Sequence, residues 1–107
     1  MEKIITYDSE QDILSIHKEY DQEEKFKGNI DIGDFILDIS TKGTVKGLEI
    51  LNASDHFQQF GITKKILENT KEIKFIVQGS KTGIMIAIKF DTPEKKIPAS
   101  FVIPIEN

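Results

Sequence analysis

The stretch DFILDISTKGTVKGLEILNAS, residues 34–54, predicts a β-hairpin that leads directly into a helix. Large apolar residues recur at every second position on both sides of Lys42-Gly43, a period typical of strands. Lys42-Gly43 suits a two-residue turn, because glycine adopts positive φ without a Cβ clash. This register pairs four apolar side chains on one face of the hairpin: Leu37 with Leu48, and Phe35 with Ile50.

Two short helices are predicted after the hairpin. Ser54 can accept a hydrogen bond from the free N–H groups at the start of the first helix, in which Phe57 and Phe60 share one face. Thr63 can cap a second helix over residues 64–69. Both helices are too short to form the core of the domain alone, so we expect them to cover a sheet.

The rest of the chain is rich in strand signals. Period-two segments occur at residues 3–7, 12–17, 28–34, 72–77, 84–90 and 101–105. Pro104 has no N–H to donate, which predicts an edge position for the last strand. We therefore predict an α+β domain: a mainly antiparallel sheet of seven or eight strands, with two short helices after Ser54 packed on one face. The predicted core is Phe35, Leu37, Leu48, Ile50, Phe57, Phe60, Ile66, Leu67, Phe75, Ile86, Ile88 and Phe101.

A length of 107 residues without a break in composition predicts a single domain. Within it, residues 3–55 hold the first hairpins and the helix start, and residues 56–107 hold the helices and a second β-meander. KIITYDSEQDILSIHK is similar to KFIVQGSKTGIMIAIK, and GDFILDI is similar to ASFVIPI. Two explanations stay open: an internal duplication, or the general likeness of short antiparallel strands.

Composition excludes several classes of function. The chain has no cysteine, which excludes disulfides, thiolate nucleophiles and cysteine metal sites. A net charge of −4 argues against direct binding to nucleic acid, which depends on Lys and Arg contacts to phosphate. No apolar run is long enough to span a bilayer or resembles a signal peptide, so we expect no membrane contact and a cytoplasmic location.

The first hairpin turn carries acidic residues at the spacing of a calcium loop. Asp8, Glu10 and Asp12 match the first three ligand positions, and Glu19 matches the last. Ile13 stands where such a loop needs glycine, so a solvated turn is the better interpretation. His17 and His56 have no partner at helical metal-site spacing, and no glycine-rich phosphate loop is present. We therefore expect no metal, nucleotide or covalent cofactor.

An acidic patch is the remaining candidate site. Asp38 and Glu49 project from the face opposite Leu37 and Leu48, and Asp34 stands nearby. Paired carboxylates can perform acid–base chemistry when burial separates their pKa values. Without such burial the same residues form an ordinary solvated sheet face.

Two sets of residues resemble a known family. They are Tyr7, Asp8, Glu10, Asp12, Leu14 and Ile16, followed by Ile36, Asp38, Gly43, Gly47, Glu49, Ile50, Leu51, Ala53 and Ser54. The pattern is similar to the small prokaryotic family called domain of unknown function 2283, over roughly residues 3–55. Leu48 replaces the usual isoleucine, and the chain continues well beyond the shared region. The resemblance implies an α+β fold without an established activity and, in some relatives, an antitoxin-like role toward small ribonuclease-type toxins.

Two functions of different classes follow. The first is a non-catalytic protein-binding module, either a homodimer or a partner of a small basic protein. Such a protein would be attracted to acidic residues at Asp8, Glu10, Asp12, Glu23 and Glu24. The second is a small enzyme or small-ligand binder that uses Asp34, Asp38 and Glu49. A pocket with a buried carboxylate favours the enzyme, and an exposed apolar patch or open sheet edge favours the binding module.

Overall fold

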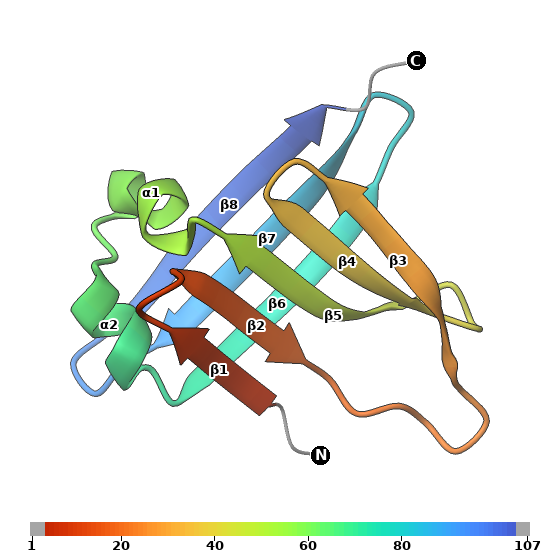
Figure 1. The fold of residues 1–107 in the computed structure, drawn as a ribbon, viewed down its shortest axis with the longest axis horizontal. Coiled ribbons are helices and arrows are strands. Elements are labelled where there is room, and N and C mark those ends of the chain that lie inside the picture. The colour runs from red at the N-terminus through yellow and green to blue at the C-terminus, as the bar shows by residue number, and fades with distance from the viewer. Residues whose placement is uncertain (1–3, 105–107) are drawn as a thin grey trace.

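Eight strands and three short helical segments make up residues 4–104, the part of the chain that the computed structural model describes (Figure 1). The strands are β1 (Ile4–Asp8), β2 (Ile13–His17), β3 (Phe26–Ile32), β4 (Phe35–Ser40), β5 (Val45–Leu51), β6 (Glu72–Gly79), β7 (Gly83–Asp91) and β8 (Lys96–Pro104). The helical segments are α1 (Ala53–Phe57), the 3₁₀ helix η1 (Gln58–Phe60) and α2 (Lys64–Asn69). These elements confirm the predicted α+β class, the number of strands and the two short helices.

The eight strands form two antiparallel sheets rather than one. The first has the order β1-β2-β5-β4-β3, and the second has the order β6-β7-β8. One sheet lies in front of the other with its strands crossing steeply, and the helices lie at one end of the pair (Figure 1). Each sheet has one apolar face, which must be buried against another layer. The second sheet supplies that layer because helices of five and six residues are too short to cover the first.

The core lies between the two sheets and is continued by the helices. Leu14, Leu37 and Ile50 from the first sheet and Ile86 and Phe90 from the second are fully or almost fully buried in one cluster. Every predicted core residue is buried except Phe60 and Ile66, which pack against the cluster while partly exposed. The predicted β4–β5 register is confirmed, with Phe35 opposite Ile50 and Leu37 opposite Leu48.

The loop of this hairpin differs from the predicted two-residue turn. The Ser40 N–H donates to the Thr44 carbonyl oxygen at 2.9 Å, so three residues, 41–43, form the loop. Gly43 has φ 78°, the left-handed conformation that glycine adopts without strain. The ladder then shifts by one residue between Asp38 and Ile39, which leaves Lys46 as a bulge. The extra residue in the loop and the extra residue in β5 offset each other, so Leu37 still lies opposite Leu48.

The predicted helix cap at Ser54 is wrong. Helix α1 begins at Ala53, and its N-cap is Asn52, at φ 52° and without a side-chain hydrogen bond to the helix. Ser54 lies inside the first turn, and Asp12 accepts hydrogen bonds from both its N–H and its hydroxyl. The second cap is confirmed, because the Thr63 hydroxyl accepts from the Ile66 N–H at 3.3 Å.

The edge position predicted from Pro104 is also confirmed, since β8 is the outer strand of its sheet. The two similar sequence segments form corresponding hairpins, β1–β2 and β6–β7. Beyond them the sheets differ, because β8 pairs with β7 whereas β5 lies between β2 and β4. An internal duplication stays a prediction. Among residues 4–104, no helix is long and apolar enough to cross a membrane.

Candidate functional site

Asp12 joins the first hairpin turn to the start of helix α1. Its Oδ1 accepts from the Tyr7 hydroxyl at 2.6 Å and from the Ser54 N–H at 3.0 Å, and its Oδ2 accepts from the Ser54 hydroxyl at 2.6 Å. The Asp12 carbonyl oxygen also accepts from the Ala53 N–H at 2.9 Å. A carboxylate from a distant strand turn therefore provides the cap that the sequence suggested for Ser54.

The protonation of this cluster follows from its geometry. Burial by itself raises the pKa of Asp12, but hydrogen bonds from Ser54 and Tyr7 outweigh it and hold the pKa below the ordinary value. Burial and the neighbouring carboxylate raise the pKa of Tyr7. Asp12 is therefore ionised near neutral pH and Tyr7 is a neutral donor. Both carboxylate oxygens of Asp12 already accept hydrogen bonds from within the protein, and these bonds attach the hairpin turn to the start of α1.

The calcium-loop alternative is not supported by this turn. Asp8 Oδ1 accepts from the N–H groups of Glu10 and Gln11, which closes the turn between β1 and β2. The Glu10 side chain is exposed. In residues 4–104, no group of three or more His, Asp or Glu side chains has the proximity needed to hold a metal ion.

His17 and Asp38 meet across a glycine on the outer face of the first sheet. Both residues pair with Gly47, His17 from β2 and Asp38 from β4. A Cβ at Gly47 would collide with the Asp38 carboxylate, so only glycine leaves room for it. His17 Nδ1 then lies 3.8 Å from Asp38 Oδ2, and Asn29 donates to Asp38 Oδ1 at 2.7 Å. The sequence analysis did not predict this close approach, although a glycine within a strand is a signal that could have indicated it.

Asp34 and His56 form the second histidine–carboxylate pair. His56 Nε2 lies 2.9 Å from Asp34 Oδ2, and Asn52 donates to the same oxygen at 3.4 Å. These hydrogen bonds, from His56 first, hold the pKa of Asp34 below its ordinary value. The His56 ring packs 5.0 Å from the ring of Phe35. The pair borders an open cavity of about 500 Å³, whose wall also includes β8.

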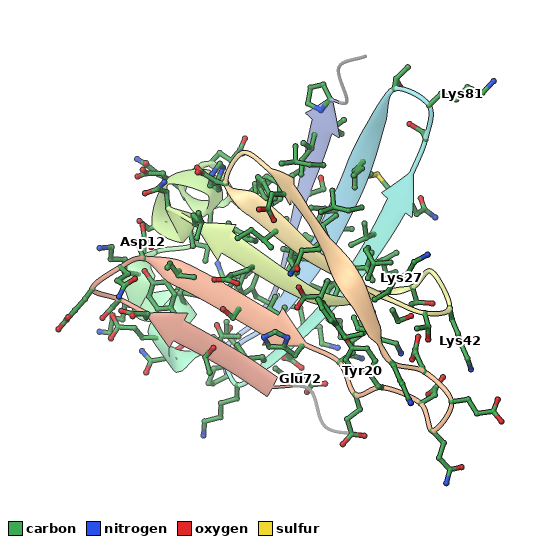
Figure 2. The ribbon with its side chains drawn as sticks, turned by 45° about the vertical axis from the view of Figure 1, so that its right-hand side comes forward. Asp12, Tyr20, Lys27, Lys42, Glu72 and Lys81 are labelled. Atoms are coloured by element: carbon green, nitrogen blue, oxygen red, sulfur yellow. The ribbon has the colours of Figure 1, made fainter. Side chains whose placement is uncertain are left out.

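The predicted acidic residues are distributed over separate places. Asp38 and Glu49 lie on the outer sheet face as expected, whereas Asp34 lies in the β3–β4 turn beside His56. Asp12 lies at the helical end of the molecule, and Tyr20, in the β2–β3 connection, lies toward the opposite end (Figure 2). The predicted surface of Asp8, Glu10 and Asp12 with Glu23 and Glu24 is therefore not continuous.

Glu24 does not belong to any surface, contrary to the prediction. Its side chain is buried, with Ser40 donating to Oε2 at 2.5 Å and Lys46 Nζ 2.9 Å from Oε1. The Asp21 N–H also donates to Oε1, at 3.2 Å. The hydrogen bond from Ser40 and those from Lys46 and Asp21 lower the pKa of Glu24 to about 2. The Lys46 bulge in β5 provides the cation that makes this burial possible.

The residues of the two motifs that resemble a known family lie together in this structure. Tyr7 and Asp12 contact Ser54, and Asp38 lies over Gly47. Residues 4–54 match the family of proteins of unknown function DUF2283. The DUF2283 segment comprises the whole first sheet and the start of α1. The second sheet and α2 lie outside the match.

Two archaeal proteins are similar over a longer region. An uncharacterised protein of Methanocaldococcus jannaschii is 38% identical over 85 residues, which cover 78% of this chain and 66% of that protein. A protein of Methanosarcina mazei named "Putative hypoxanthine phosphoribosyltransferase" is 28% identical over 89 residues, which cover 83% of this chain and 68% of that protein. The chain thus spans about two thirds of the length of these relatives. No solved structure matches it.

Proposed function

We propose that this protein is a non-catalytic protein-binding module that self-associates through the outer face of the sheet β6-β7-β8. The observation that carries the proposal is the exposure of three large apolar side chains on that face. Ile76 is 62% exposed, Met85 39% and Val102 73%. Contiguous apolar surface of this kind marks interaction sites on proteins in water.

The three side chains surround a shallow floor. Ile76 of β6 pairs with Ala87 of β7, which in turn pairs with Ser100 of β8, so small residues lie between the large ones. A cavity of about 450 Å³ with a mostly apolar lining lies over Ile76, Ala87 and Ser100 and extends toward the row of Lys74, Lys89 and Pro98. A protruding side chain such as Val102 of a second copy has the size to enter it.

The rows on either side of Ile76 and Ala87 make the face suited to its own copy. One neighbouring row carries Lys74 and Lys89, and the other carries Met85 and Val102. A half-turn about an axis across the strands places the lysine row of each copy over the apolar row of the other. The aliphatic lysine stems then cover apolar side chains while the ammonium groups stay in water. In this arrangement no lysine row faces a lysine row.

The size of the face predicts a weak complex. Three strands at a spacing of about 4.8 Å and strands of nine residues at about 3.3 Å per residue give a face of roughly 400 Å² per copy. Standard stable interfaces bury about 800 Å² per partner. We therefore expect a dimer that dissociates in the micromolar range.

Sedimentation velocity across the micromolar range tests the proposal. The wild-type protein should show a monomer–dimer equilibrium, and Val102→Lys should remain monomeric at every concentration. Ile30→Lys is the control, because Ile30 is also an exposed large apolar residue, at 43%, but lies on β3 of the other sheet. A strictly monomeric wild-type protein, or a Val102→Lys variant that dimerises like wild type, contradicts the proposal.

A small-ligand function is the alternative, and the Asp34–His56 pair beside its cavity is the observation that favours it. One relative has an enzyme name that refers to hypoxanthine. Titration of this protein with hypoxanthine, followed by NMR, tests the alternative directly. Saturable shifts at His56 would support a ligand-binding site, whereas unchanged spectra would leave the binding module as the better function.

A further inference from the structure

The outer edge of β8 is one of the sheet edges with unpaired main-chain groups. We propose that its segment from Ser100 to Pro104 binds an extended peptide with a basic side chain, the main chain pairing with Ser100 and Val102 and the basic group binding Asp34. This site uses the main-chain groups at the edge of β8, whereas self-association uses the side chains on the outer face of the sheet, Val102 among them, and the partner is a different chain.

The direction of the main-chain groups of β8 follows from the turns at both ends of β7. The Ser80 N–H donates to the Gly83 carbonyl oxygen at 2.9 Å, so Gly83 directs its backbone groups toward β6. The Thr92 N–H donates to the Lys95 carbonyl oxygen at 3.0 Å, so even-numbered residues at the end of β7 bond toward β8. Antiparallel pairing alternates residue by residue. Both hydrogen bonds therefore predict that the odd-numbered residues of β7 bond to β6 and that its even-numbered residues bond to β8.

The pattern determines which groups of β8 point outward. Residues of β8 that pair with the odd-numbered residues of β7 have their N–H and C=O groups at the free edge; among them are Ser100 and Val102. Pro98 and Pro104 occupy the same alternating set, and a missing N–H is tolerated only there. The Ser100 and Val102 N–H groups point away from β7, and within residues 4–104 they have no hydrogen-bond acceptor. Two donors between two prolines are thus available to a short added strand.

The cavity beside this edge gives the peptide side chains a place to bind. Its lining includes residues 100–104 of β8, and the opposite wall is formed by the β3–β4 turn and by His56 and Gln59. Phe35 and Phe101 pack at 5.4 Å between ring centroids and provide an apolar part of the wall. A strand added to β8 would therefore have one side chain directed toward this wall.

The carboxylate of Asp34 favours a positively charged peptide side chain in this cavity. Its Oδ2 is used by His56 and Asn52, while Oδ1 has no hydrogen-bond partner among the described residues. The Asp34 side chain is 37% exposed, so a cation can reach it from the cavity. A lysine or arginine of the peptide satisfies Oδ1, and an acidic residue would be repelled. The free main-chain donors favour an extended peptide over a nucleobase in the same cavity.

A peptide titration followed by amide NMR shifts tests the site. The probe is the blocked peptide Thr-Val-Lys-Val-Thr, compared with the same peptide carrying Glu in place of Lys. We expect the lysine peptide to shift the amide signals of Ser100, Val102 and Asp34, and to bind about tenfold more tightly than the glutamate peptide. Equal affinity of the two peptides, or shifts confined to other residues, would overturn the proposal.

Matched variants separate the main-chain contact from the side-chain contact. Val102→Pro removes one outward N–H at a position of the same set as Pro98 and Pro104, whereas Val102→Ala keeps it. We expect about tenfold weaker binding for Val102→Pro and nearly unchanged binding for Val102→Ala. Asp34→Asn should remove the preference for lysine. An N-methylated lysine peptide tests the same hydrogen bonds with unaltered protein, so the result does not depend on how Val102→Pro folds.

The experiment also distinguishes this site from self-association. Titrations use protein diluted to concentrations at which it is monomeric. The peptide result then does not depend on whether the sheet-face dimer exists. Ser100 and Val102 also lie on the sheet face used for self-association, so a shift of their signals alone with protein concentration reports the sheet-face dimer. If concentration also shifts the Asp34 signal, a second copy occupies the edge and its cavity, and the peptide proposal is wrong. If N-methylation leaves the affinity unchanged, the peptide does not bind as an added strand, which also contradicts it.

Discussion

Asp12 and Ser54, 42 residues apart in the chain, are joined by two hydrogen bonds that fix helix α1 to the first hairpin. The carboxylate accepts from the Ser54 N–H and hydroxyl, and the Tyr7 hydroxyl binds the same group. The contact lies within the DUF2283 segment and contains residues of both of its motifs. It gives these residues a structural explanation, and it leads to the first prediction.

Asp12→Ala should destabilise the protein by about 2–3 kcal/mol, because it leaves the Ser54 N–H and the Tyr7 hydroxyl without their charged acceptor. Ser54→Ala removes the hydroxyl alone and should cost about 1 kcal/mol. Urea unfolding measures both free energies. The double variant should cost less than the sum of the single ones, and strict additivity would show that the two side chains are not coupled.

Glu24 should make the protein sensitive to acid. Its folded-state pKa is about 2 against an ordinary value of 4.5, lowered by the hydrogen bond from Ser40 and by Lys46. A carboxylate with a lowered folded-state pKa stabilises the fold fully above about pH 4.5, and this contribution disappears as the pH falls toward 2. Glu24→Gln should therefore be less stable than wild type at neutral pH but show a flatter loss of stability across that window. Unfolding by urea at stepped pH values measures it, and parallel curves for the two proteins would contradict the assignment.

Gly47→Ala should destabilise the first sheet by about 2 kcal/mol, because the new methyl group displaces the Asp38 carboxylate. The displacement also breaks the hydrogen bond from Asn29 to Asp38. Placing Gly47→Ala in an Asp38→Ala background removes the clash, so the same substitution should cost clearly less there. An equal cost in both backgrounds would point to the strand backbone rather than to Asp38.

The three-residue loop of the β4–β5 hairpin can be distinguished from a two-residue turn by glycine substitution. Only Gly43 of this loop has positive φ, so Gly43→Ala should cost about 1 kcal/mol. Lys42→Gly should also destabilise, by about 0.5–1 kcal/mol, since it only adds freedom to the unfolded chain. In a two-residue turn of the hairpin type, Lys42 would have positive φ and the same change would stabilise. Thermal unfolding of the two variants decides between the loops.

Local patterns in the sequence determined which segments form strands, the hairpin register and the second helix cap, although β3 and β8 begin earlier than predicted. Phe35 faces Ile50 because alternation fixes which side chains share a face, and a shift by one residue would expose them all. Thr63 caps α2 because its acceptor and the Ile66 N–H are three residues apart. The resemblance of residues 3–55 to a known family depended on the same kind of short pattern.

Tertiary structure alone decided which residues from distant parts of the chain meet. Ser54 was a plausible cap by position, yet Asp12 provides the acceptor because the β1–β2 turn lies against the helix start. Glu24 is buried because a bulge brings Lys46 to it, and no local period encodes a bulge. The eight strands likewise form two sheets, because the apolar face of each sheet is buried against the other sheet. Periodicity describes the face of one strand, whereas the partner across the core or the sheet depends on how the whole chain folds.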